Sequence, residues 1–268
     1  MSALQRIQQK YKTTTILVSL GATMRSKCYI LFLNILFPIK KFLHLSPTIK
    51  TSIELNKFGK TFTFYIFDYS DLLALIDVIG QDEYHFPEMN SPKVILDLGS
   101  NIGTSIIAFK LKYPNSTIYG FEPNPHIFER LQKNCAQFTK IHLFPYAISD
   151  QNGTEKLFLQ SEGFFSSSLN KNVAHTNYAK VETKTLDSIL TTLVHSHVDL
   201  IKFDIEGIEL KAFRAFKQLS SADYLIGELH TDLIEGSIED FCTLFTHFEI
   251  TNTQVTDVHF LFKAIRKT

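Results

Sequence analysis

Tryptophan is absent from this 268-residue chain, and cysteine is scarce. The three cysteines, Cys28, Cys135 and Cys242, are far apart and form no CxxC pair. The sequence therefore supports neither a disulfide framework nor a zinc knuckle. Unpaired cysteines are typical of proteins kept in a reducing compartment, so we expect a cytoplasmic protein. Hydrophobic residues still make up 44% of the chain, which is enough for a sizeable core.

Acidic residues are absent from the first 53 positions, although the same stretch carries eight lysines and arginines. Because the formal net charge is zero, the remainder must carry −8 (0 minus 8). This asymmetry indicates an anionic partner surface or a targeting segment. We therefore predict that residues 1–48 form a basic, apolar segment that associates peripherally with an anionic membrane surface. Two alternatives stay open: an acid-poor organellar transit peptide, although no cleavage site stands out, and a helical cap on the remaining chain.

A hydrophobic run long enough to cross a bilayer is also missing near the N-terminus. The apolar stretch "CYILFLNILFPI" covers only residues 28–39, whereas a transmembrane helix needs ~20 apolar residues. Asn34 and Pro38 interrupt this stretch further. The pattern favours a helix that lies in the membrane interface or is buried in the core.

Residues 49–90 form a second segment with a hairpin and a helix. The stretch "TSIELNKFGKTFTFYIF" indicates two strands around a turn that ends in Gly59. Ser70 is then expected to cap a short helix, with Gly80 as its stop. We predict that this segment extends the domain that follows it.

Residues 91–268 alternate between strand and helix patterns, so we expect an α/β domain. Five short apolar strands are predicted, at residues 93–99, 116–122, 141–148, 198–205 and 223–229. Amphipathic helices are predicted at residues 104–113, 125–138, 208–219 and 234–248. The last two strands, "FEITNTQV" and "VHFLFKAIR", are joined by so short a turn that they must be antiparallel. The expected fold is a mostly parallel sheet with a closing antiparallel strand.

A glycine-spaced turn follows the first of these strands, in "VILDLGSNIG". In an open α/β sheet, ligands bind beyond the carboxyl ends of the strands, where this turn is expected. A dinucleotide-binding turn has the spacing GxGxxG, whereas residues 97–103 have the spacing DxGxNxG. Asn101 tolerates the left-handed backbone that a glycine would otherwise provide. Glu122 ends the next strand, where an acid can accept hydrogen bonds from ribose hydroxyls.

The ordered motifs resemble the FkbM-type family of S-adenosylmethionine (SAM)-dependent methyltransferases. They are "ILDLGSNIGTSIIAFK", "IYGFEPNPHIFERLQKN", "YAISDQNG", "TKTLDSIL" and "VDLIKFDIEGIELKAF", and they cover about residues 91–230. The resemblance implies a class I, Rossmann-like methyltransferase fold, SAM as the methyl donor, and O-methylation of a hydroxyl on a sugar, glycan or related metabolite. It implies these cofactor-binding residues: Asp97, Gly99, Asn101 and Gly103 around the methionine part, Glu122 on the ribose, and Tyr146 or Ala147 near the adenine. The acceptor is therefore expected to be a small molecule or glycan, and no nucleic acid partner is expected.

Polar side chains end the two strands that are expected beside the first one. Asp204 and Glu206 follow the strand that contains Lys202, and Glu228 and His230 end the next strand. Parallel strands place their carboxyl ends together, so these side chains should gather near the donor methyl group. We predict Asp204 as the first choice for the base, followed by His230 and Glu228, with Lys202 as a charge partner. The same set of Asp204, Glu206, Glu228 and His230 could instead hold a divalent metal such as Mg²⁺.

Several of these features also have structural interpretations. Glu209 is expected to favour the N-terminus of the helix that follows it. His230 could be a hydrogen-bonded structural residue, and residues 163–170 could be a plain surface loop rather than a lid over the substrate. Two other functions stay open for the whole chain. One is an NAD-dependent enzyme, which the turn spacing disfavours, and the other is a non-catalytic binding module of the same fold.

Overall fold

The computed structural model of the chain describes residues 3–44, 49–159, 167–169, 177–194 and 197–267. The chain divides into two compact units. The first unit comprises Met1–His85, Ile102–Pro114 and Lys133–Gln137, and the second comprises Phe86–Asn101, Asn115–Gln132 and Phe138–Thr268.

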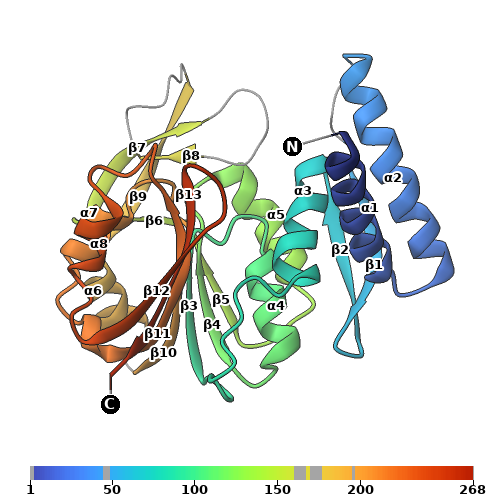
Figure 1. Cartoon of the computed structure of the whole chain (residues 1–268). Coiled ribbons are helices and arrows are strands. Elements are labelled where there is room, and N and C mark those ends of the chain that lie inside the picture. The colour runs from blue at the N-terminus through green and yellow to red at the C-terminus, as the bar shows by residue number, and fades with distance from the viewer. Residues whose placement is uncertain (1–2, 45–48, 160–166, 170–176, 195–196, 268) are drawn as a thin grey trace. The chain divides into compact units, whose positions relative to one another are not determined.

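The first unit contains four helices and a two-stranded sheet among its described residues (Figure 1). The helices are α1 (Ala3–Ser19), α2 (Met24–Phe42), α3 (Tyr69–Ala74), which continues as a π-helical turn over Leu75–Gly80, and α4 (Thr104–Lys112). The antiparallel strands β1 (Thr51–Lys57) and β2 (Lys60–Ile66) form the predicted hairpin around Phe58 and Gly59. None of the described helices is both long and apolar enough to cross a bilayer.

The N-terminus of α3 lies slightly before the position that the sequence predicted. Asp68, rather than Ser70, is the capping residue, and its side chain accepts a hydrogen bond from the backbone of Ser70. Asp71 completes a reciprocal capping box. The prediction was wrong here because all three residues are good capping types, and only the backbone conformation decides among them.

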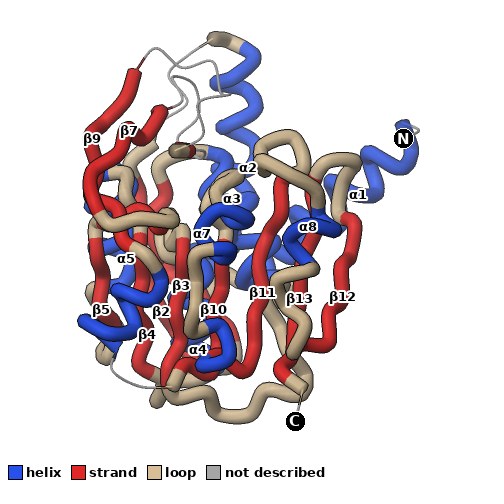
Figure 2. Tube along the Cα trace, turned by 90° about the vertical axis from the view of Figure 1, so that its left-hand side faces the viewer, coloured by secondary structure: helices blue, strands red, loops and turns tan. Residues whose placement is uncertain are grey.

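The second unit is built on a seven-stranded sheet with the order β12-β13-β11-β10-β3-β4-β5 (Figures 1 and 2). Its strands are β3 (Val94–Leu98), β4 (Thr117–Phe121), β5 (Ile141–Phe144), β10 (Val198–Phe203), β11 (Ala222–His230), β12 (Phe248–Gln254) and β13 (His259–Arg266). The central strands pair in parallel, whereas β13 pairs antiparallel with both β11 and β12. This is the mostly parallel sheet with an antiparallel closure that the sequence predicts.

A smaller four-stranded sheet in the same unit was not predicted. It contains β6 (Tyr146–Ile148), β7 (Gly153–Leu159), β8 (Ser167–Ser168) and β9 (Asn177–Lys184), in the order β6-β9-β7-β8. The strand predicted over residues 141–148 therefore splits into β5 and β6, which belong to different sheets. Pro145 stands between them and has no N–H to donate to a strand ladder.

Three helices of the second unit, α5 (Pro125–Cys135), α7 (Glu209–Arg214) and α8 (Ile238–Cys242), are shorter than their apolar spacing predicts. The second unit also contains α6 (Leu186–Ile189), which continues as a π-helical turn over Leu190–Val194. Phe245 and Phe248 lie beyond the end of α8, and Phe248 begins β12. Both are nevertheless buried in one cluster with Phe241. The apolar spacing therefore predicted correctly that these side chains are buried, but it predicted wrongly that they all lie on one helix.

Candidate functional site

The turn after β3 has the backbone that its glycines predict. Gly99, Asn101 and Gly103 all have positive φ, at 75°, 45° and 92°. A Cβ atom on Gly99 would lie 1.8 Å from the carbonyl oxygen of Asp204, so only glycine fits at this position. The turn after β3 and the end of β10 therefore touch through their backbones. Gly103 directly precedes α4 and belongs to the first unit.

Glu122 follows β4 and links that strand to the glycine turn. Its Oε2 accepts a hydrogen bond from the backbone N–H of Asn101 (3.1 Å), and its Oε1 accepts one from Asn124 (2.8 Å). Burial raises the pKa of Glu122 to about 7, although the two backbone hydrogen bonds act in the opposite direction. Each carboxylate oxygen has a second lone pair, so Glu122 can still accept a hydrogen bond from a ligand.

Asp97 and Lys202 form a buried ion pair beneath the turn. The strand register places the two residues side by side on β3 and β10, and Lys202 Nζ lies 3.3 Å from Asp97 Oδ1. Lys202 also donates a hydrogen bond to the carbonyl oxygen of Gly99 (2.9 Å). Burial lowers the pKa of Lys202, but the negative charges of Asp97 and its neighbours outweigh this effect and raise it overall. Lys202 therefore holds the turn in place as a cation.

A cleft of about 610 Å³, counted with its part open to solvent, lies at this edge of the sheet. All of its lining residues belong to the second unit. Those that the sequence singled out are Gly99, Asn101, Glu122, Tyr146, Ala147, Asp204 and Glu206, and apolar side chains such as Phe121, Ile127 and Leu157 complete the lining. The cleft thus combines the glycine turn with two of the four predicted acid-His residues.

Asp204 and His230 lie close together where β10 and β11 end. His230 Nε2 lies 3.6 Å from Asp204 Oδ1, which is an ion pair longer than a hydrogen bond. Burial opposes ionisation of both groups, but their mutual attraction outweighs it. The pKa of Asp204 is lowered, and the pKa of His230 is raised to about 9. At neutral pH the pair is therefore a carboxylate and an imidazolium.

Glu206 lies beside this pair on a strained backbone. Its φ is 56°, which is unusual for a residue other than glycine, asparagine or aspartate. Burial, followed by repulsion from Asp204, raises the pKa of Glu206 to about 8. Backbone strain of this kind is often found at ligand sites. Glu206 lines the cleft, so a bound acceptor could meet a protonated carboxyl group here.

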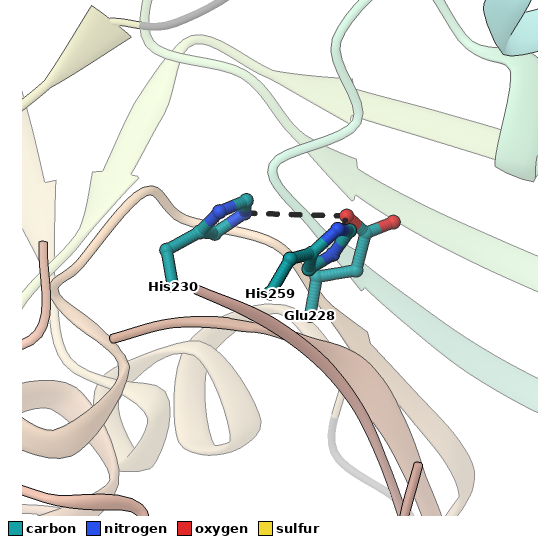
Figure 3. Close-up of side chains that lie close together, drawn as sticks. All are labelled: Glu228, His230 and His259. Atoms are coloured by element: carbon teal, nitrogen blue, oxygen red, sulfur yellow. Dashed lines mark ion pairs between the residues drawn. The ribbon is translucent and has the colours of Figure 1, made fainter. Parts of the chain in front are cut away.

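Glu228 completes the predicted cluster, but a fifth residue joins it (Figure 3). His259 Nε2 lies 2.6 Å from Glu228 Oε2, whereas His230 Nε2 lies 4.0 Å from the same oxygen. The rings of His230 and His259 stack, with centroids 4.7 Å apart. Sequence reasoning missed His259 because it starts the last strand, β13, and only the pairing of β13 with β11 brings it opposite His230.

Glu209 has a structural position. Its two carboxylate oxygens accept hydrogen bonds from the backbone N–H groups of Ile205 (3.0 Å) and Gly207 (2.9 Å). The side chain is fully buried and does not line the cleft. Glu209 therefore stabilises the loop between β10 and α7, close to the structural role that the sequence predicted.

Among the described residues, two groups of side chains are spaced closely enough to hold a metal ion. They are Glu228, His230 and His259, and Asp204, Glu206 and His230, and in each group the potential ligand atoms lie within 4.8 Å of one another. The predicted metal candidates therefore lie together.

A lid over the cleft was also predicted at residues 163–170. Most of that segment lies outside the described residues, but Leu169 lines the cleft.

Comparison with known protein families gives one match along most of the second unit. The family model described as the methyltransferase FkbM domain matches residues 97–267. The matched region starts at Asp97 and includes the glycine turn, Glu122 and the whole acid-His cluster. It leaves out α1, α2 and the β1–β2 hairpin.

Curated relatives are distant and match the chain in part. "Methyltransferase 1" of Beauveria bassiana is 26% identical over 169 residues, which cover 55% of this chain and 64% of that protein. "2-O-methyltransferase NoeI" of Sinorhizobium fredii is 27% identical and covers 54% and 67%. "Hexuronic acid methyltransferase AglP" of Haloferax volcanii is 28% identical and covers 53% and 58%. The chain thus spans between 58% and 67% of the lengths of these relatives.

Solved structures extend the likeness in fold. A fibrillarin/Nop5p complex matches with a TM-score of 0.50 and 12% sequence identity, over 82% of this chain and 97% of that chain. At this identity the match concerns the fold alone. It confirms the predicted α/β fold of class I methyltransferases.

Proposed function

Since the chain belongs to the methyltransferase FkbM domain family, we propose that it is a SAM-dependent methyltransferase acting on a hydroxyl group of a sugar, glycan or related metabolite. The observation that carries this proposal is the cleft itself. It brings the glycine turn and Glu122 together with the ionised carboxylate of Asp204. The proposed site for the methyl donor therefore lies beside Asp204, whose carboxylate can receive the proton of the acceptor hydroxyl.

The residues of the cleft fit SAM. The buried side-chain oxygen of Asn101 accepts no hydrogen bond from the described residues, so it is available to a ligand at the turn. Glu122 retains lone pairs for the ribose hydroxyls, and Tyr146 and Ala147 line the part of the cleft assigned to the adenine. When bound, SAM supplies a methyl group on a sulfonium sulfur, ready for in-line displacement.

The proton of the acceptor hydroxyl is assigned to Asp204. This carboxylate lines the cleft, whereas His230, Glu228 and His259 lie behind it and do not. His230 holds the charge of Asp204 in place through the 3.6 Å ion pair. A base positioned in this way contributes ~10²–10⁴-fold to the rate. Lys202 acts indirectly, because it holds Asp97 and the carbonyl oxygen of Gly99.

The sugar assignment rests on the names of two relatives. One is described as a 2-O-methyltransferase and another as a hexuronic acid methyltransferase. Both names fit an oxygen acceptor on a small molecule or glycan.

A cytoplasmic location is part of the proposal, because the three cysteines are unpaired, as is typical of a reducing compartment.

The decisive experiment combines binding with methyl transfer. Calorimetry on the full chain should show binding of SAM and none of NADH. Glycan extracts incubated with the protein and methyl-tritiated SAM should become labelled, and mass spectrometry should find the corresponding methyl-sized difference. Binding of NADH in place of SAM would contradict the proposal. Binding of SAM without label in any extract would leave the non-catalytic module.

Asp204→Asn tests the assignment of the base. The substitution keeps the shape of the side chain and removes its charge, so SAM affinity should hold while turnover falls ~10²-fold or more. Near-normal turnover in both Asp204→Asn and His230→Ala would show that the cluster is structural.

Chelation with EDTA tests whether the cluster holds a metal ion that turnover requires. We expect no effect, whereas loss of turnover that Mg²⁺ restores would turn the cluster into a metal site.

A further inference from the structure

The helix α2 is apolar on two opposite faces. One face carries Ile30, Leu33 and Phe37, which are buried, because α2 packs against α1, β1 and α3 of its own unit. The other face is exposed. At about 100° per residue, its large hydrophobic residues all fall on one side of the helix, and they are Met24, Leu31, Phe32, Ile35, Ile39 and Phe42. Below, these six residues are called the outer face of α2.

Such exposure is concentrated in this one region. Among the described residues, thirteen large hydrophobic side chains are exposed, and seven of them lie between Met24 and Leu43. Phe42 is 82% exposed, and Ile35 and Phe32 are 55% and 53% exposed. Contiguous exposed apolar surface on a soluble unit marks an interaction site, whereas isolated apolar side chains do not.

Basic residues border the outer face. At about 100° per residue along a helix, Arg25 and Lys27 flank it on opposite sides. Lys40 lies near the C-terminal end of α2, and Lys10 and Lys12 lie on α1. No acidic residue occurs before Glu54. The partner of this surface must therefore be apolar at its centre and negatively charged at its edge.

We propose that the outer face of α2 docks on an anionic membrane surface, with the helix lying in the plane of the lipid headgroups. A bilayer surface offers acyl chains and negative headgroups side by side, which matches an apolar stripe between two cations. A second copy of the chain would instead bring like charges together. This inference concerns the first unit and does not depend on methyl transfer.

The absence of tryptophan provides a direct test. Phe32→Trp introduces the single tryptophan of the chain at a 53% exposed position, and Tyr178→Trp provides a control at a 50% exposed position of the second unit. The full-length variants are mixed with vesicles of equal parts phosphatidylcholine and phosphatidylserine. The emission of Phe32→Trp should shift to the blue, and that of Tyr178→Trp should not. An unchanged emission from Phe32→Trp, or equal shifts in both variants, would overturn the proposal.

Vesicle sedimentation tests the same surface by removing it. In the double variant Phe32→Ser with Ile35→Ser, partition onto the mixed vesicles should fall about 10-fold or more. The matched variant Val255→Ser with Val258→Ser removes two exposed residues elsewhere and should partition normally. Thermal unfolding and SAM binding should be unchanged in both double variants, which separates a failure here from a failure of the proposed enzyme. Equal partition of the two variants would contradict the proposal.

Light scattering without lipid tests the alternative that a second copy of the chain covers the outer face. The full chain should be monomeric, and the Phe32→Ser with Ile35→Ser variant should have the same mass. A dimer of the parent chain that this variant dissociates would show that a second copy covers the outer face, and would overturn the membrane proposal.

Discussion

Buried carboxylates in the second unit differ in what their oxygen atoms already bind. Glu209 uses both oxygens on backbone N–H groups and lies away from the cleft, so it has a structural role. Glu122 makes a similar pair of backbone hydrogen bonds but lines the cleft. Asp204 lines the cleft with its charge stabilised by His230. At the scale of single residues, access to the cleft separates the acids proposed for ligand binding and chemistry from the structural one.

Glu122→Ala should weaken SAM binding. The substitution removes the carboxylate proposed to accept hydrogen bonds from the ribose, which should cost roughly 2–4 kcal/mol of binding free energy. Calorimetry on the full chain measures this loss. Glu129→Ala, on the exposed side of α5, is the control and should bind SAM normally. Unchanged affinity in Glu122→Ala would remove Glu122 from the site.

The pH dependence of turnover distinguishes the two candidate bases. The pKa of Asp204 is lowered, so its carboxylate is ionised throughout the neutral range, and kcat should be flat between about pH 5 and 7, below the pKa of about 8 of Glu206. The pKa of His230 is raised to about 9, so a neutral His230 is rare below that pH. If His230 were the base, kcat would rise about tenfold per pH unit toward 9. Measurements at saturating SAM avoid the separate titration of Glu122.

Three chain segments meet at the site, through a backbone contact and through the carboxylate of Glu122. The turn after β3 contacts the end of β10 at Gly99 and Asp204, and the loop after β4 binds the turn through Glu122 and Asn101. Parallel pairing of β3 with both β10 and β4 brings these ends to one edge of the sheet. At the scale of elements, the site depends on the close packing of loops.

Gly99→Ala should therefore be far more damaging than a typical glycine substitution. The new Cβ atom would lie 1.8 Å from the carbonyl oxygen of Asp204, on a backbone with a φ of 75°. We expect a loss of at least ~3 kcal/mol in the free energy of unfolding, measured by urea denaturation. Gly153→Ala is the matched control, because its nearest neighbour is the Thr183 hydroxyl at 3.9 Å, and it should change stability by only ~0.5 kcal/mol. Similar values for the two variants would contradict the geometry of the turn.

The two units differ in how they use apolar residues. The second unit buries a dense aromatic cluster under its large sheet, formed by Phe203, Phe213, Phe241, Phe245 and Phe262. Phe203 directly precedes Asp204, so this cluster supports the edge of the sheet at which the cleft lies. The first unit exposes apolar residues along α2 instead. At the scale of the whole molecule, we expect the second unit to carry the chemistry and the first to carry the membrane contact.

Phe262→Ala tests the contribution of this cluster. Phe262 is fully buried on β13 and contacts Phe203, Phe241 and Phe245. Its truncation leaves a cavity and should lower the free energy of unfolding by roughly 3–5 kcal/mol, measured by urea denaturation. Val258→Ala, at an exposed position just before β13, should change it by less than ~0.5 kcal/mol. A small effect of Phe262→Ala would mean that the core can close around the missing ring.

The sequence by itself determined those features that depend on local chemistry. Apolar runs fixed the five parallel strands, because residues buried on both faces of a sheet need no alternation. Gly99, Asn101 and Gly103 determined the turn, because few residues adopt positive φ. The start of α5 is likewise local, because the Asn124 side chain accepts hydrogen bonds from the backbone N–H groups of His126 and Ile127. The ordered motifs identified the family, because their residue types and their order along the chain can be read from the sequence alone.

Only the tertiary structure decided the features that depend on distant pairing. His259 joined the cluster because β13 pairs with β11 in a register that no local signal records. The sequence also did not determine which acids face the cleft. In the structure, Asp204 and Glu206 line it and Glu228 does not. The same holds for α2, whose sequence is apolar on two sides. The elements of its own unit pack against Ile30, Leu33 and Phe37 and leave the opposite side of α2 exposed. Which of the two apolar sides is buried depends on where the neighbouring elements lie, and the sequence of α2 does not contain that information.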